Sequence, residues 1–487
     1  MKKLLVVLLS LGLIVAFGMT ASAADVKFGG SYYLVGVYES NPALRPSESS
    51  YSHAFFYQKF RLQPVFQIAE GLTFTARIDA MEKQWGNNNW GGSYDDQTAT
   101  LPTVPKMTPP RGNQANLEFE RAYVTFMTGI GMFQIGYQNV DDWGTDYGDF
   151  SNSRPRIAFA TKFGPVTLNL VYEKLFESDT AGINSTATYN TTTGYPYYTN
   201  ADNDTYAISA TYNCKGVEAG LLYKNYVLNT LVNNAGTGAG LNTDRPHGVS
   251  AIRNLIAPYM KATFGPVYIE GEAQYWFGSY AQYEAPVTGV KDVDLQAYGA
   301  YLKAKMNVGP AYFGALFSYA SGDDFSDASK NTINPGGAGT NYAPALILMN
   351  DALRAWTMRD SCGASVTNFV GNGVAGAAMG ANAPSSNKYN SIIYSVFGGF
   401  NPTPKLNLEA NLIYATVDKK ELSATTKADS DKLGTEIDIK ATYKIYDNLS
   451  YMIGAGYLMT GDYFKGANTA ATVDNNYLLI NQLTLSF

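Results

Sequence analysis

The chain has 487 residues, with 35 Lys and Arg against 41 Asp and Glu, a formal net charge of -6, and 16% charged residues. No basic stripe dominates, so nucleic acid is not expected as a partner. Two cysteines, Cys214 and Cys362, and no C-x-x-C-H motif exclude a disulfide framework and a c-type haem held by this chain. The two cysteines are expected to stay unpaired.

The N-terminus has the pattern of a secretory signal peptide. Lys2 and Lys3 precede an apolar stretch over residues 4–17, and Ala21, Ser22 and Ala23 form an A-x-A cleavage site. A helix needs about 20 apolar residues to cross a bilayer, which disfavours an uncleaved anchor. We therefore predict a signal peptide over 1–23 and a single mature domain over 24–487. No cysteine follows the apolar stretch, so a lipoprotein is not expected.

The mature sequence alternates apolar and polar residues with the period of a β-strand. Residues 56–80 show this well: Phe60 and Leu62 fall on one face, while Lys59 and Arg61 fall on the other. The mature chain is longer than one soluble core usually supports, and no linker divides it. A transmembrane barrel resolves this, because its apolar face contacts lipid and its charged face lines water. The expected fold class is all-β, an up-and-down antiparallel transmembrane β-barrel.

Short turns give the strand count. Pro and Gly suit them because the chain must reverse within few residues. Two strands for each turn, an opening strand over 26–38 and a closing strand give about 18 strands, with 16 as the fallback. The short turns and both termini are predicted to be periplasmic, and the long polar segments extracellular. The eight turns are 70–71, 129–131, 163–165, 214–216, 264–266, 308–310, 401–405 and 447–448.

Residues 321–388 contain no convincing strand and form the longest predicted loop. Within it lies an apolar island over 343–358, where Leu346, Met349, Leu353 and Trp356 would share one helical face. Loops of this length are usually functional or disordered. We expect the segment to fold partly into or over the pore mouth; a surface cap remains an equal alternative.

The sequence ends in an alternating strand that stops at an aromatic residue. Tyr477, Leu483, Leu485 and Phe487 lie on one face of it, and Asn481 interrupts that face. This strand resembles the terminal signal by which outer-membrane barrels are recognised for assembly. Residues 60–86 and 118–137 resemble the early hairpins of Gram-negative outer-membrane porins, and the overall pattern is similar to the abundant porins of delta-proteobacterial metal reducers. Residues 319–323 resemble strand-to-loop junctions of the larger porins and, more distantly, of alginate-export-type barrels. The resemblance implies an outer-membrane location, contact with lipid and lipopolysaccharide, and insertion by the barrel-assembly machinery.

Reading the inward face of the early strands gives a basic arc of pore-lining residues. Asp79 also points inward and partly offsets the positive charge of this arc. The segment 139–153 between the fifth and sixth strands carries four aspartates, and general-diffusion porins fold this loop inward, so the resemblance implies an eyelet with a cationic wall facing an acidic loop. The alternative is an ordinary wetted lumen without a constriction. The arc is Lys59, Arg61, Arg77, Arg121, Arg154, Arg156 and Lys162, and the acidic loop residues are Asp141, Asp142, Asp146 and Asp149.

The later strands carry inward charges of alternating sign, which predict cross-strand salt bridges. Their near-balanced charge leaves ion preference open. Five aromatic side chains also fall inward in this register, although a slip of one residue would turn them to lipid. The charged residues are Glu270, Glu272, Lys303, Lys305, Glu409, Glu436, Asp438, Lys440 and Lys444, and the aromatic ones are Tyr259, Tyr268, Trp276, Tyr301 and Tyr312.

No catalytic or metal-binding pattern stands out. The two histidines, His53 and His247, have no local triad pattern, and no phosphate-binding motif occurs. Neither an enzyme nor a cofactor is expected. The leading functional hypothesis is a porin for passive diffusion of small hydrophilic solutes and ions. A barrel sheathing a multihaem cytochrome is the alternative, and a channel for a polyanion is the third. A homotrimer and a monomer both remain open.

Overall fold

The computed structural model describes residues 25–41, 52–85, 117–177, 202–231, 248–283, 291–339, 342–350, 389–470 and 472–487. The predicted signal peptide, Cys362 and His247 lie outside these residues. Nineteen strands form one hydrogen-bonded sheet. The two-residue β14 attaches only to β12, in parallel, so 18 antiparallel strands form the wall, as the turn count predicts.

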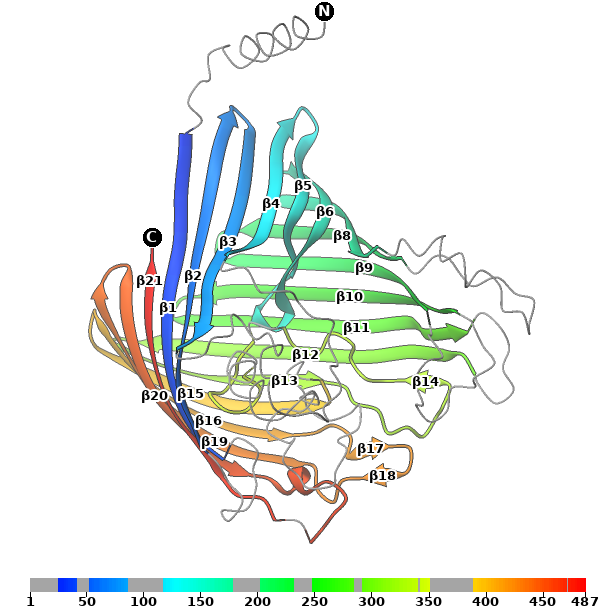
Figure 1. Ribbon diagram of the computed structural model, residues 1–487, viewed down its shortest axis with the longest axis vertical. Helices are drawn as coiled ribbons and strands as arrows, with labels where there is room; N and C mark the ends of the chain where they lie inside the picture. The colour runs from blue at the N-terminus through cyan, green and yellow to red at the C-terminus, as the bar shows by residue number, and fades with distance from the viewer. Residues whose placement is uncertain are drawn as a thin grey trace, which may run out of the picture.

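The wall strands follow one another in chain order (Figure 1). They are β1 (Asp25–Ser40), β2 (Ser52–Ala69), β3 (Leu72–Gln84), β4 (Leu117–Thr128), β5 (Gly131–Asp142), β6 (Asp149–Phe163), β7 (Val166–Phe176), β8 (Asn203–Cys214), β9 (Val217–Leu231), β10 (Gly248–Phe264), β11 (Val267–Tyr283), β12 (Val293–Val308), β13 (Ala311–Ala320), β15 (Ser391–Thr403), β16 (Leu406–Thr416), β19 (Lys432–Tyr446), β20 (Leu449–Thr460) and β21 (Asn476–Ser486). Small additions are β14 (Lys330–Asn331), the hairpin β17 (Glu421–Ser423) and β18 (Thr426–Lys427), and the 3-10 turns η3 (Asp146–Gly148) and η5 (Asp462–Lys465).

All eight predicted turns join neighbouring strands, each through two residues between the strand bounds. In three of them a Gly-Pro pair reverses the chain, with Gly164 and Gly265 at φ +58 and Gly309 at φ +57. Glycine adopts this left-handed conformation without the steric cost that a Cβ brings. Because each turn is local, these positions could be read directly from the sequence.

The barrel closes between its first and last strands. β1 pairs with β21 from Ser31 opposite Ser486 to Ser40 opposite Tyr477, so the predicted closing partners are confirmed, and Figure 1 shows the blue and red strands side by side. Gly30 and Phe487 exchange two backbone hydrogen bonds of 2.8 and 3.1 Å. Closure removes both free sheet edges, which could not be hydrated within a bilayer.

The two faces of the wall differ in polarity. On β19, Ile437 and Ile439 are exposed on the outside, while Glu436 and Asp438, which alternate with them, are buried inside. Other strands repeat this alternation, so the outer surface is apolar and the interior holds most of the charge. No helix among the described residues is long and apolar enough to cross a membrane.

The structure corrects two expectations about the loops. The segment 139–153 is mostly strand: β5 extends to Asp142 and β6 begins at Asp149, so the connection is only 143–148. Polar residues there pair across the hairpin, and a bulge near Asp141, whose φ is +58, bends it. In the long loop, residues 345–349 form bends and a turn rather than the expected helix, and Lys330–Asn331 adds a short strand; residues 353 and 356 lie outside the described part.

Closure gives a first testable prediction. A Cβ on Gly30 would lie 2.4 Å from the Arg61 carbonyl oxygen and 2.7 Å from the Phe487 ring. Gly30→Leu is therefore expected to cost about 1–3 kcal/mol through overpacking at the seam and to lower the fraction of folded barrel, measured by heat-modifiable mobility in electrophoresis. Phe28→Leu, two residues away at a side chain that is 62% exposed, is the matched control. Equal folding of both variants would contradict this account.

Candidate functional site within the barrel

Three cations of the basic arc converge on one carboxylate. Arg61 makes two hydrogen bonds to Asp79, of 2.7 and 2.9 Å. Lys59 lies 2.7 Å and Arg77 lies 3.4 Å from the same carboxylate. Lys59 also contacts Glu82 at 2.9 Å. The inward positions of these residues follow from their alternation on β2 and β3, and their charge is largely neutralised locally.

The remaining cations of the arc lie on β4 and β6, with β5 between them. Arg121 donates to the Asn139 side-chain oxygen at 2.8 Å, and Arg156 donates to the Asn139 carbonyl at 2.7 Å. Arg154 donates to Asp141 at 2.7 Å. Lys162 is exposed at the inward position nearest the turn between β6 and β7. The arc thus runs along one side of the interior.

The four aspartates predicted for the acidic loop do not act as one group. Asp141 lies on the same wall as the arc, where it pairs with Arg154 and with Lys224 of β9, the latter at 2.6 Å. Asp142 accepts from Asn139 at 3.0 Å, and Asp149 accepts from the Ser151 hydroxyl at 2.7 Å. Asp146 is exposed in the turn η3. Asp141 is therefore neutralised by cations on its own wall instead of facing the basic arc across the lumen.

Residues 143–148 cross the interior and attach to the opposite wall, where Figure 1 shows the ends of β5 and β6 over β11 and β12. The Trp143 indole N–H donates to the Ala257 carbonyl of β10 at 3.0 Å. The backbone N–H and hydroxyl of Thr145 donate to Glu272 of β11 at 2.8 and 2.9 Å. A Cβ on Gly148 would collide with Glu272, so this close approach requires glycine. The chain therefore narrows its own lumen here.

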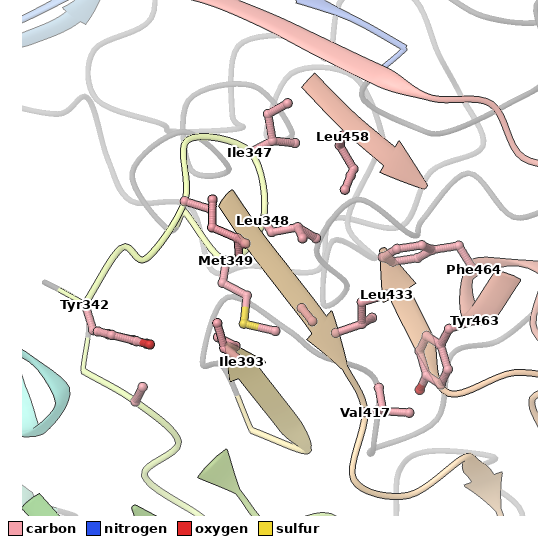
Figure 2. Close-up of a cluster of buried hydrophobic side chains, with 14 of the residues drawn as sticks. Tyr342, Ile347, Leu348, Met349, Ile393, Val417, Leu433, Leu458, Tyr463 and Phe464 are labelled. Atoms are coloured by element: carbon pink, nitrogen blue, oxygen red, sulfur yellow. The ribbon is translucent and has the colours of Figure 1, made fainter. Parts of the chain in front are cut away.

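A second segment, 342–350 of the long loop, also lies inside the barrel. Glu436 of β19 accepts the Ile347 and Leu348 backbone N–H groups, each at 2.7 Å, and Asp438 accepts the Leu346 N–H at 3.0 Å. Ile347, Leu348 and Met349 are at most 1% exposed. Figure 2 shows their side chains directed toward the barrel strands near Leu458, Leu433 and Ile393. The described part of the long loop thus folds inward.

The two inward segments meet at a cluster of three tyrosines. The Tyr147 ring stacks on Tyr301 of β12 with centroids 5.6 Å apart, and it lies edge-on to Tyr342 at 5.7 Å. The Tyr147 hydroxyl donates to the Tyr319 carbonyl at 2.6 Å, and the Gly339 N–H donates to the Tyr147 carbonyl at 2.7 Å. Tyr147 therefore links the short crossing loop to the long loop.

The later strands show some of the predicted cross-strand pairs. Lys303 pairs with Glu270 at 3.2 Å, and Lys440 pairs with Glu409 at 2.5 Å. Lys305 instead lies over the Tyr312 ring, with its Nζ 4.0 Å from the centroid. Glu436 and Asp438 bind the backbone of the long loop rather than a cation. Inside the barrel also lie Tyr259, Trp276 and Tyr301, all buried, and Tyr268, which donates to Glu270.

Between the crossing loop and the wall of β5 to β11 lies a cavity of about 640 Å³. Sequence reasoning missed Lys224 and Glu173, which pair at 2.6 Å on its wall, and it missed Arg253. Their inward direction was available from strand alternation, but their partners come from other strands. Within the described residues no group of three or more His, Cys, Asp or Glu side chains could hold a metal ion.

The cluster around Asp79 yields a second prediction. The Asp79 side chain is 1% exposed, so Asp79→Asn leaves three cations without their shared counter-charge. We expect a loss of about 3–5 kcal/mol in unfolding free energy and a reversal potential shifted toward anion preference in a KCl gradient. Asp462→Asn, at an exposed carboxylate paired with Lys465, is the control. An unchanged reversal potential in folded Asp79→Asn would show that the Asp79 carboxylate does not contribute to the ion preference.

No family model and no curated protein matches the sequence. Solved structures that match include OccAB4 of Acinetobacter baumannii, with 12% identity, a TM-score of 0.46, and coverage of 96% of this chain and 100% of that one. OpdK of Pseudomonas aeruginosa matches with 10% identity and a TM-score of 0.45 over 95% and 99%. The anion-selective porin from Comamonas acidovorans matches with 10% identity and a TM-score of 0.41 over 95% and 100%. With identities of 12% or less and TM-scores below 0.5, these likenesses carry no conclusion about the function of this chain.

The architecture itself defines the class of protein. A closed antiparallel barrel with an apolar outside and a charged inside satisfies every backbone polar group within a bilayer. That is the architecture of an outer-membrane β-barrel, and the chain is one.

Proposed function

We propose that this barrel is a porin through which small hydrophilic solutes and ions diffuse passively across the outer membrane. The observation that carries the proposal is the charged interior with a cavity of about 640 Å³ beside a loop that crosses the lumen. Fixed charges and a narrowed section bias which ions enter such a passage. The described charged side chains are mostly paired, so permeation is expected to depend on the size of the solute and on the few unpaired charged groups.

Planar-bilayer recording of the refolded barrel tests the proposal. We expect discrete single-channel steps in KCl, and swelling of proteoliposomes in small sugars but not in large dextrans. A reversal potential under a salt gradient gives the ion preference in the same experiment. Folded protein that inserts and gives no conductance would overturn the proposal.

The alternative function, a sheath around a multihaem cytochrome, requires room for a protein partner inside the barrel. Residues 143–148 and 342–350 take up part of that room and hydrogen-bond to the wall, which favours the channel. Purification from the native membrane distinguishes the two functions. A haem-free protein that conducts supports the porin, whereas stoichiometric haem that co-purifies supports the sheath.

A further inference from the structure

Arg253 differs from the other cations that line the lumen cavity. Arg154 is paired with Asp141, and Lys224 is paired with both Asp141 and Glu173. Arg156 donates to the Asn139 carbonyl, and its Nε, although it has no hydrogen-bond partner, lies 4.0 Å from the Glu173 carboxylate. In the described chain no carboxylate pairs with Arg253, and its buried Nε has no hydrogen-bond partner. A buried N–H group without an acceptor costs free energy, and an anion that neutralises the guanidinium would offset part of that cost.

The local backbone holds Arg253 in this position. The pairing of β10 with β11 shifts register between Ser250 and Arg253, which marks a β-bulge. Gly278, opposite Arg253, has φ +116, and a Cβ there would collide with the Ile252 carbonyl. The Ile252 N–H donates to the Ser279 hydroxyl at 2.7 Å. The extra residue of the bulge lies on β11, whereas β10 keeps an unbroken register with β9. Regular alternation along β10 therefore places Arg253 on the same face as Leu255, at the cavity.

One contact orients the guanidinium. Its central carbon lies 4.6 Å from the centroid of the Tyr280 ring, a cation–π distance. A cation–π contact of this kind uses none of the N–H groups as hydrogen-bond donors, so they remain available for an acceptor. A planar carboxylate accepts two parallel hydrogen bonds from such a fork.

Beside Arg253 the cavity wall is apolar. Arg253 pairs across the ladder with Tyr226 of β9, and the neighbouring Leu255 pairs with Trp276 of β11. The Tyr226 and Trp276 rings lie 5.4 Å apart, and Trp276 belongs to a cluster of buried apolar residues. A ligand that fits this site has an anionic end for the arginine and an apolar body for the rings.

The acidic residues on the cavity wall do not compete with such a ligand. Asp141 and Glu173 are occupied by Lys224, and Glu272 is occupied by the backbone N–H and hydroxyl of Thr145. Asp142 accepts from Asn139. Each of these four carboxylates has a partner, whereas no carboxylate among the described residues pairs with Arg253.

We propose that Arg253 and the apolar wall beside it form a binding site for a small organic carboxylate inside the lumen. The inference rests on the proposed channel function, for which it supplies a solute class. The anion would bind the guanidinium fork, and its apolar part would lie along the Trp276 side of the cavity. Inorganic anions such as chloride have no apolar part to contact the Trp276 side of the cavity and would bind more weakly.

Two measurements with benzoate as the probe test the site. Calorimetry on the folded barrel in detergent measures binding directly, and bilayer recording in KCl measures the block of current. Arg253→Gln is expected to weaken both about tenfold, which corresponds to about 1.4 kcal/mol. Arg253→Lys, which keeps the charge but not the fork, is expected to lie between wild type and Arg253→Gln. Lys405→Gln, which removes an equal charge from an exposed short turn, should leave both unchanged.

The outcomes separate this inference from the channel itself. Benzoate binding that Arg253→Gln weakens supports the site even if the barrel fails to conduct, in which case only the porin function falls. A conducting barrel that benzoate neither binds nor blocks overturns the site. Equal affinity in folded Arg253→Gln and wild type also overturns it. Heat-modifiable mobility establishes that each variant is folded before the comparison.

Discussion

Glu436→Ala is expected to open the lumen, seen as a larger single-channel conductance with added open-state noise. In the wild type the two carboxylate oxygens of Glu436 accept the backbone N–H groups of Ile347 and Leu348, and all three residues are buried. A buried donor that loses its acceptor costs about 1–3 kcal/mol, so the loss of two such acceptors removes about 2–6 kcal/mol from the docking of this segment. The segment should then leave the wall for part of the time.

Neighbouring variants sharpen this prediction. Glu436→Gln keeps one acceptor oxygen and should give an intermediate conductance. Asp438→Asn keeps an acceptor for Leu346 and should have a smaller effect. Glu421→Gln alters a carboxylate in the hairpin β17–β18, which pairs with the exposed Lys427 and accepts none of the backbone N–H groups of residues 346–348, and serves as the control. Wild-type conductance in a folded Glu436→Ala barrel would show that the segment does not restrict the passage.

The strand count was predictable because its evidence is local. A two-residue turn needs only its own Gly, Pro or Asn, and the flanking alternation names the outward residues without knowledge of any partner. The alternating segment that ends at Phe487 indicated the last strand. An even number of strands allows this strand to pair antiparallel with β1 and close the barrel. These features depend on residues close together in the sequence.

The path of the inward segments was less predictable because it depends on distant contacts. The apolar residues at 345–349 have a spacing that suits a helix, yet their backbone N–H groups bind Glu436 and Asp438, about 90 residues away. Those carboxylates were expected to form salt bridges across the sheet. A carboxylate fits either partner, and only the curvature of the closed wall decides which of the two reaches it.

The acidic loop shows the same limit. Asp141 was expected to face the arginines across an eyelet. Instead the hairpin of β5 and β6 bends at Asp141, whose φ is +58, and brings this residue to Arg154 beside it and to Lys224 of β9. The identity of the charges was correctly read from the sequence, but their opposition depends on a backbone bend that alternation does not report. Arg253 was also missed, although alternation along β10 directs it inward, because its lack of a carboxylate partner depends on contacts between strands.

Tyr147→Ala is expected to loosen both inward segments at once. The side chain is 1% exposed and contacts Tyr301 and Tyr342, while its hydroxyl donates to the Tyr319 carbonyl. Truncating a buried aromatic residue costs about 3–5 kcal/mol, so the crossing loop should lose much of its attachment. Tyr147→Phe keeps the ring contacts and should cost only the hydroxyl hydrogen bond, about 0.5–1.5 kcal/mol. The expected readout is a lower guanidinium midpoint together with a higher conductance in Tyr147→Ala.

A double-mutant cycle with Glu436→Ala tests whether the two segments support each other. Tyr342 lies between them: its ring packs on Tyr147, and the chain continues from it to the residues bound by Glu436. If the crossing loop and the long loop form one unit, the double variant should lose less unfolding free energy than the two single variants lose together. Residues that share such contacts show coupling of about 0.5–3 kcal/mol. Losses that add within about 0.3–0.5 kcal/mol would mean that the segments narrow the lumen independently. Each segment could then move without the other, and the conductance changes of the two single variants should combine without interaction.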